Sequence, residues 1–151
     1  MDNKHSITDV LGLTSSYCKI AGLKILKEQG YTDITSEQFG LLYILSQKEG
    51  LYQSQIANLL VKDRPNITRM VDILEKKGFL RRAKDETNRR IMKLYITDEG
   101  RQKVEALEPL RHDFIKTISK DFTEDELEEL FYLLKKIRTN IEKAYDVQLW
   151  K

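Results

Sequence analysis

Residues 53–78 read QSQIANLLVKDRPNITRMVDILEKKG, and this stretch decides the fold. Its first eight residues place apolar side chains at helical spacing, and the polar turn Val61-Lys62-Asp63 separates them from a second helical pattern. Pro65 suits the first position of that second helix and is expected to leave Arg64 in the cap, while Gly78 ends the helix. Two helices joined by such a short turn are a common way to present one helix to the DNA major groove.

A basic β-hairpin is predicted directly after the two helices. Residues 80–84 and 91–96 are expected to be strands, because Met92, Leu94 and Ile96 alternate with more polar neighbours. Residues 62–93 contain eleven Lys or Arg and five Asp or Glu, a net charge of +6, although the whole chain carries only +2. This concentration favours a nucleic-acid partner, and a solvated charged face is the alternative.

The composition excludes several other classes of protein. The chain has 151 residues, enough for one domain, and its apolar runs are far shorter than the roughly 20 residues of a membrane span. The polar start MDNKHSITDV lacks the apolar region of a signal peptide, so we expect a cytoplasmic protein without a membrane partner. One cysteine and two scattered histidines, His5 and His112, offer no metal cluster and no nucleophile–base pair. We therefore expect neither an enzyme nor a cofactor.

Four further helices are expected around the central pair. The first covers about residues 7–29, and the second opens at a capping box that begins at Thr35. The third is capped by Thr97 and is expected to kink at Pro109, and the fourth opens at another capping box, at Thr123. The expected fold class is mainly α, a winged helix-turn-helix of about six helices and a small β-hairpin wing.

The outer helices predict how the chain assembles. The last helix carries an apolar stripe at three- and four-residue spacing, formed by Leu127, Leu130, Leu134, Ile137 and Ile141. Because the outer helices offer more apolar surface than a compact winged unit can cover, we expect a two-fold homodimer, with packing inside one chain as the alternative. Residues 1–34 and 101–151 would then serve dimerisation and residues 35–100 would form the winged helix-turn-helix. Such a dimer places two reading helices about 34 Å apart on one face of the DNA.

From Thr35 to Gly100, and more loosely over its whole length, the sequence resembles the MarR family of bacterial winged-helix regulators. The residues that carry the resemblance are Thr35 and Gln38, Ile56 to Leu60, Asp63 to Asp72, Leu74 to Arg82, Asn88-Arg89-Arg90, and Ile96 to Gly100. The resemblance implies an obligate dimer built from the first helix and the last two. It also implies binding to palindromic operators in double-stranded DNA, mostly as a repressor, and release by a small-molecule effector.

The chain departs from the family pattern at two places. Asn88 stands at the wing tip where the family usually has an aspartate, and it can accept a hydrogen bond from Arg90 but lacks the negative charge that would strengthen this bond. Tyr52-Gln53-Ser54 stands where the family commonly opens its third helix with Thr or Ser. Neither change removes the groups that are expected to face DNA.

Helix geometry identifies the candidate base-reading residues. With Ile67, Met70, Val71 and Leu74 facing inward, the side chains that point furthest outward belong to Pro65, Arg69, Asp72 and Lys76. Recognition helices contact bases through their N-terminal residues, so we expect Asn66, Thr68 and Arg69 to reach base edges. Arg69 suits guanine and Asn66 suits adenine, while Pro65 and the Thr68 methyl group suit a thymine methyl. The alternatives are an ion pair between Arg69 and Asp72 and a capping or solvated role for Asn66.

The remaining candidates are expected to contact the DNA backbone or the minor groove. Backbone contacts are assigned to Gln53, Ser54, Arg64 and Lys76. At the wing tip, Arg90 with Arg89 is expected to enter the minor groove, favouring a narrow A·T-rich flank. Asn88 completes this tip, and a purely structural partnership between Asn88 and Arg90 is the alternative.

An effector pocket is expected between the dimer helices and the winged unit, as the resemblance implies. Tyr17, Tyr43 and His112 are its candidate lining residues, although a helical aromatic residue more often belongs to the core. Cys18 is expected to be a buried structural thiol, because only Lys19 adjoins it to lower its pKa. In oxidant-sensing relatives the cysteine lies nearer the N-terminus and is paired with a tyrosine where this chain has Ser36. The sequence does not identify the effector.

Overall fold

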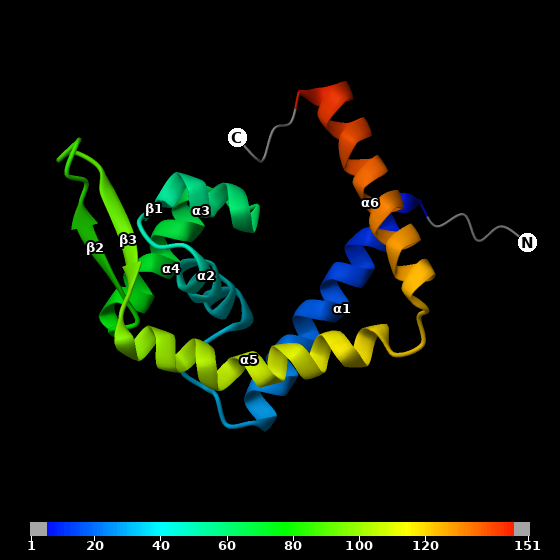
Figure 1. Cartoon of the computed structure of the whole chain (residues 1–151), viewed down its shortest axis with the longest axis horizontal. Coiled ribbons are helices and arrows are strands. Elements are labelled where there is room, and N and C mark those ends of the chain that lie inside the picture. Colours follow the sequence, from blue (N-terminus) through cyan, green and yellow to red (C-terminus); the bar gives the residue numbers. More distant parts are fainter. Residues whose placement is uncertain (1–5, 147–151) are drawn as a thin grey trace, which may run out of the picture.

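The computed structural model describes residues 6–146, which form six helices and a three-stranded antiparallel sheet (Figure 1). The elements follow in the order α1 (Ile7–Glu28), α2 (Ser36–Gln47), β1 (Leu51–Tyr52), α3 (Gln53–Leu60), α4 (Arg64–Lys76), β2 (Leu80–Lys84), β3 (Met92–Ile96), α5 (Asp98–Ser119) and α6 (Glu124–Tyr145). This architecture confirms the predicted winged helix-turn-helix. Within the described residues, none of the helices has the length and apolar character that crossing a membrane requires.

Local side-chain caps explain where several helices begin. The Thr35 hydroxyl accepts a hydrogen bond from the backbone N–H of Gln38 at 3.1 Å, and the Gln38 side chain accepts one from the N–H of Thr35 at 3.1 Å. Ser6 opens α1 and Thr123 opens α6 with the same reciprocal arrangement. Each arrangement satisfies two backbone N–H groups that have no partner inside the helix. The two capping boxes predicted from sequence are confirmed.

The start of α4 differs from the prediction. Asp63 is the cap, and its carboxylate accepts a hydrogen bond from the backbone N–H of Asn66 at 2.9 Å. Arg64 is therefore the first residue of the helix and Pro65 the second. Proline is tolerated there because the first backbone N–H groups of a helix have no intrahelical partner. Further along the chain, α5 is one helix from Asp98 to Ser119 that contains Pro109, and the kink expected there stays a prediction.

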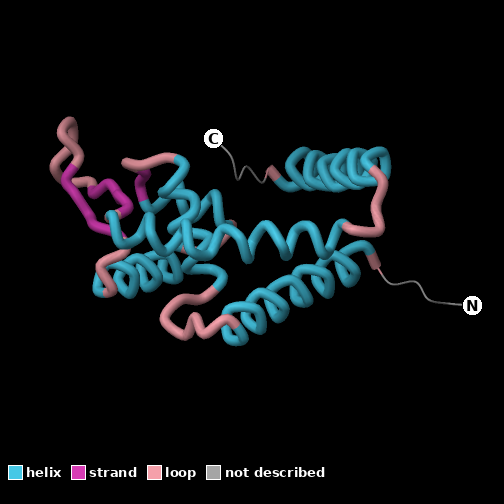
Figure 2. Tube along the Cα trace, turned by 60° about the horizontal axis from the view of Figure 1, so that its bottom comes forward, coloured by secondary structure: helices cyan, strands magenta, loops and turns pink. Residues whose placement is uncertain are grey.

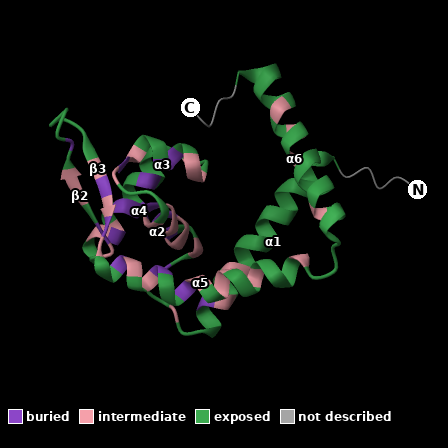
Figure 3. Ribbon diagram, viewed as in Figure 1, coloured by how far each residue is buried: buried purple, intermediate pink, exposed green. Residues whose placement is uncertain are grey.

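The hydrophobic core lies where α2, α3, α4 and α5 meet the sheet, and the outer helices contribute little to it (Figure 3). Its fully buried side chains are Leu41, Leu42, Leu45, Ile56, Ile67, Val71, Leu74, Leu80, Leu94 and Leu107. From α4 it includes Ile67, Val71 and Leu74, with Met70 at 8% exposure, so the predicted inner face of this helix is confirmed. The core therefore fixes which side of α4 is turned outward.

The sheet connects the wing to the helix-turn-helix. Strand β3 is central and pairs with β2 from Leu80↔Ile96 to Lys84↔Met92, and with β1 through Leu51↔Leu94. We did not predict β1, because two residues are too short to show an alternating pattern. Met92 is 37% exposed, so the predicted alternation buries only Leu94 and Ile96.

The outer helices leave much apolar surface uncovered in the single chain. No residue of α6 is buried, and Leu26 is the only buried residue of α1. The exposed large apolar side chains of these two helices are Ile7, Val10, Leu11, Leu13, Tyr17, Ile20 and Leu23 on α1 and Leu130, Phe131, Tyr132, Leu133, Ile141 and Tyr145 on α6. Two views show α6 standing away from the winged unit (Figures 1 and 2). Packing inside one chain therefore leaves these side chains exposed, although Leu127, Leu134 and Ile137 of the predicted α6 stripe are half-buried.

Candidate nucleic-acid interface

Helix α4 presents a polar outer face opposite its buried residues. The exposed residues of this face and of the adjoining helix start are Arg64, Pro65, Asn66, Thr68, Arg69, Asp72 and Lys76. The structure thus brings the candidates predicted on α4 together on one accessible surface. Ser54 at the start of α3 is also exposed, and Gln53 beside it is half-buried.

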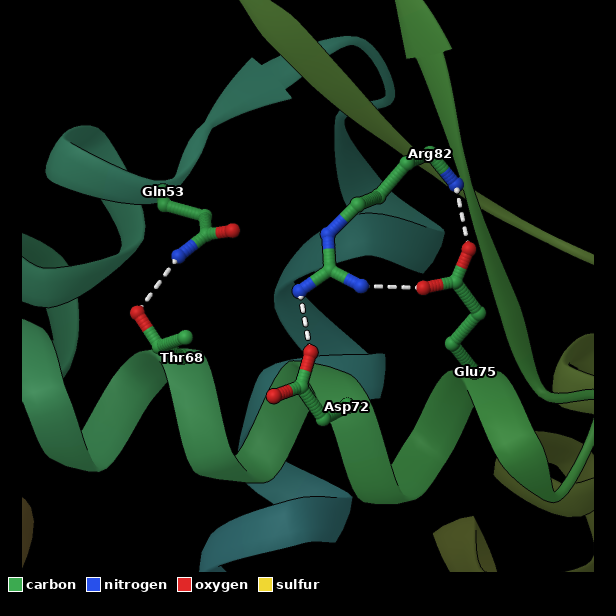
Figure 4. Close-up of polar contacts among 5 residues, drawn as sticks. All are labelled: Gln53, Thr68, Asp72, Glu75 and Arg82. Atoms are coloured by element: carbon green, nitrogen blue, oxygen red, sulfur yellow. Dashed lines mark hydrogen bonds and ion pairs between the residues drawn. The ribbon is translucent and has the colours of Figure 1, made fainter.

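Arg69 is not held by an acidic side chain of residues 6–146. The predicted alternative, an ion pair with Asp72, is not formed because Asp72 binds another arginine. Arg82 Nη2 lies 2.6 Å from Asp72 Oδ1, and Arg82 Nη1 binds Glu75 (Figure 4). Arg82 therefore joins β2 to α4 and leaves the Arg69 guanidinium available for a partner outside the chain.

Two polar contacts at the start of α4 restrain other candidates. Gln53 Nε2 donates to Thr68 Oγ1 at 3.0 Å and so joins α3 to α4 (Figure 4). The Asn66 side-chain amide donates to Asp63 Oδ2 at 2.7 Å, so the capping alternative for Asn66 is present in the structure. The Asn66 side-chain oxygen and the Thr68 methyl group are not used in these contacts. These two side chains are therefore held in place with groups still free to meet a base.

The wing tip turns through backbone contacts of Asn88. The Asn88 side-chain oxygen accepts a hydrogen bond from the backbone N–H of Arg90 at 3.1 Å, and its carbonyl accepts one from the N–H of Ile91 at 3.0 Å. The Asn88 side chain was predicted to bind the Arg90 side chain, but in the structure it binds the backbone N–H of Arg90 instead. Arg89 and Arg90 are both exposed, at the end of the hairpin that extends from the core (Figure 1).

A buried carboxylate lies at the base of the wing loop, and our sequence interpretation missed it. Asp85 is only 3% exposed and accepts hydrogen bonds from the Tyr52 hydroxyl and from the backbone N–H and hydroxyl of Thr87, both at 3.1 Å. Lys93 Nζ lies 3.6 Å from Asp85 Oδ1. The hydrogen bond from Tyr52, followed by those from Thr87, lowers the pKa of Asp85 to about 2. The only sequence signal was the unusual tyrosine at position 52.

The three predicted effector residues do not line one cavity. Tyr17 is 68% exposed on α1. The guanidinium carbon of Arg111 lies 4.5 Å from the centroid of the Tyr43 ring. His112 borders a shallow groove on α5. Tyr17 lies on α1, Tyr43 on α2 and His112 on α5, and these helices do not turn the three side chains toward a common space.

An apolar pocket of about 170 Å³ lies instead between α1, α2 and α5. It is lined by Cys18, Gly22, Ile25, Leu26, Ser36, Phe39, Leu107, Leu110, Arg111 and Phe114. The Ser36 hydroxyl oxygen is buried and has no hydrogen-bond partner among residues 6–146. Cys18 is exposed in the single chain, so the expectation of a buried thiol is wrong there.

The described part of the chain offers no alternative metal chemistry. Among residues 6–146, no group of three His, Cys, Asp or Glu side chains is placed to hold a metal ion. His5 lies outside the described residues. The chemistry of the surface is that of exposed guanidinium, amide and hydroxyl groups, which suits recognition of a nucleic acid.

Comparisons with known proteins agree with this surface. The MarR family model matches residues 34–92. The HTH-type transcriptional regulator PapX of Escherichia coli is 34% identical over 115 residues, which cover 68% of this chain and 70% of PapX. The transcriptional repressor MprA of Escherichia coli K12 is 26% identical, over 80% of this chain and 68% of MprA. The S. aureus MepR–DNA complex superimposes with a TM-score of 0.82 at 25% identity, covering 93% of this chain and 99% of that one. The chain belongs to the MarR family of transcriptional regulators, which are DNA-binding proteins and not enzymes.

Proposed function

We propose that the chain acts in the cytoplasm as a homodimeric repressor, which binds a palindromic operator and releases it when a small molecule binds. The observation that carries this proposal is a winged unit with an arginine free of ion pairs on the outer face of α4 and two exposed arginines on the wing tip. The similarity to the repressor MprA supports repression rather than activation.

The proposed contacts follow from the chemistry of each exposed group. Arg69 binds guanine O6 and N7, Asn66 binds adenine, and Thr68 and Pro65 meet a thymine methyl. Arg90 with Arg89 enters the minor groove beside the Asn88 turn. Contacts to the phosphate backbone come from Gln53, Ser54, Arg64 and Lys76.

The uncovered apolar stripes support the homodimer. Apolar patches of more than a few hundred Å² are rare on monomers, and α1 and α6 expose their stripes along most of their length. A second copy that covers these stripes by two-fold symmetry would also present two α4 helices to one duplex. Dimerisation would therefore cover the exposed apolar side chains and give the protein the two-fold symmetry that a palindromic operator has.

Selection of bound duplexes from a random pool tests this proposal. We expect enriched sequences with two inverted half-sites whose centres lie about 34 Å, one helical turn, apart or at a multiple of that distance. Sedimentation of the free protein should give a dimer. A monomer, enriched sequences without symmetry, or no preference for any duplex over heparin at physiological salt would contradict it.

The pocket between α1, α2 and α5 supports a small, mostly apolar effector. A cavity of about 150 Å³ in another protein is large enough to bind benzene, so a single aromatic ring fits here. The unpartnered Ser36 hydroxyl favours a ring that carries one hydrogen-bonding group. The proposed effector class is therefore a phenol or a similar monocyclic molecule.

Fluorine NMR titrations test this pocket with 4-fluorophenol and fluorobenzene as probes. We expect both to bind, and we expect Ser36→Ala to weaken 4-fluorophenol about threefold to tenfold, because one hydrogen bond is lost. Fluorobenzene is the matched control and should bind both proteins equally. Failure of both probes to bind, or equal losses for both on Ser36→Ala, would contradict the assignment.

A further inference from the structure

We propose that Tyr52 is a positioning residue for DNA binding, whose hydroxyl bond to Asp85 holds the base of the wing against the start of α3. The inference rests on the proposed DNA binding and adds to it a residue that touches the wing rather than the DNA. The contact at the base of the hairpin would therefore determine how the wing-tip arginines, Arg89 and Arg90, are oriented.

The contact joins two segments that are far apart in the sequence. Tyr52 precedes α3, and Asp85 is the first residue after β2, 33 residues further along the chain. The backbone N–H of Asp85 also donates to the carbonyl of Ile91 at 2.9 Å, and Thr87 donates twice to the Asp85 carboxylate. Asp85 therefore joins both ends of the wing loop, through its carboxylate to Thr87 and through its backbone N–H to Ile91.

Tyr52 belongs to the helix-turn-helix side of this contact. It occupies the position just before α3, and its backbone N–H donates to the side chain of Gln55 at 2.9 Å. Strand β1 pairs Tyr52 with Lys93 of β3, whose ammonium group lies 5.5 Å from the centroid of the Tyr52 ring. The same ammonium group faces Asp85. A shift of α3 or of the wing base would break this cluster, so the two parts are held at one angle.

The wing tip makes this support necessary. Asn88 fixes the turn through the backbone N–H groups of Arg90 and Ile91 and does not bind the Arg90 guanidinium, and the described residues offer Arg90 no acidic partner. Orientation of its guanidinium must therefore come from the frame of the hairpin. The bond between Tyr52 and Asp85 supplies a charge-assisted contact within that frame, which is stronger than a neutral one.

Amide hydrogen exchange, followed by NMR on the full chain, tests the structural half of the inference without DNA. We expect Tyr52→Phe to speed the exchange of the wing amides of Thr87, Arg90 and Ile91 while the amides of α4 keep their protection. Tyr95→Phe is the matched control, because it removes a hydroxyl from the same sheet without touching Asp85. Unchanged wing amides in Tyr52→Phe, or the same change in Tyr95→Phe, would overturn the inference.

Binding to the duplex selected by the wild-type protein tests the functional half. We expect Tyr52→Phe to weaken binding about tenfold, the size of a lost hydrogen bond to a charged group. We also expect this loss to shrink in an Arg90→Ala background, which a general loss of stability would not produce. An equal loss with and without Arg90 would overturn the inference. If the wild-type protein selects no duplex, the proposed function fails, while the exchange experiment still tests the contact.

Discussion

Replacing Gly100 by alanine should lower the free energy of unfolding by about 3 kcal/mol or more, at the upper end of what overpacking costs. Gly100 is buried at the start of α5, and a β-carbon there would overlap the carbonyl oxygen of Phe79 and lie 2.8 Å from Cγ1 of Ile96. That carbonyl accepts a hydrogen bond from the backbone N–H of Thr97 at 3.1 Å, so it cannot turn away without breaking a second contact. The strain would separate α5 from the wing.

Gly40→Ala is the matched control for this experiment. Gly40 lies inside α2, and its added β-carbon would meet Leu60 Cδ2 at 3.6 Å, an ordinary van der Waals distance. Alanine is the better helix former by about 0.8–1.0 kcal/mol, so this variant should be as stable as the wild type or more stable. Urea unfolding at one protein concentration measures both variants, since the stability of a chain that forms the proposed dimer would depend on concentration. Equal stability of the two variants would contradict the close approach at Gly100.

Local patterns explain what could be predicted from the sequence. The inner face of α4 was predicted because four apolar residues at helical spacing leave only one side of the helix to bury. The capping boxes at Thr35 and Thr123 were predicted because their hydrogen bonds span only three residues. Exposure of Arg69 and Lys76 then followed from the helical period alone.

Contacts between distant segments explain what could not be predicted. Asp72 was a plausible partner for Arg69 from spacing, but Arg82 of β2 occupies it, and only the folded hairpin brings that side chain near. From the sequence, Tyr52 was only a departure from the family pattern. Its role could not be predicted, because its partner Asp85 lies 33 residues away and meets it only in the folded sheet. Neither contact leaves a periodic trace in the sequence.

The effector residues illustrate a different limit. Aromatic type and helical position selected Tyr17, Tyr43 and His112, but a pocket depends on how three helices are turned toward each other. The pocket in the structure is lined by aliphatic residues and two phenylalanines, together with Ser36 and Arg111, which composition alone does not mark as ligand contacts. Cys18 is exposed for a related reason, since its cover would have to come from outside the single chain.

Removing Arg69 and removing Arg90 should weaken DNA binding in different ways. Arg69→Ala should cost about 1–3 kcal/mol on the preferred operator and relax selectivity at one base pair, since a forked contact to guanine is lost. On a scrambled duplex the same variant should bind nearly as the wild type does. The fold should be unaffected in this variant, because Arg69 forms no ion pair in the described part of the chain. The loss should therefore be confined to the operator, which carries the guanine.

Arg90→Ala should weaken the operator and the scrambled duplex alike, because the wing responds to charge and groove width rather than to base edges. The slope of log affinity against log salt should shrink by about 1, as one contact to the duplex is lost. Lys120→Ala removes the same charge at the far end of α5, away from the wing, and should leave both affinities unchanged (Figure 1). Gel-shift titrations of the three variants on both duplexes at two salt concentrations give the result. Equal losses from Arg69→Ala and Arg90→Ala on both duplexes would mean that α4 does not read the bases.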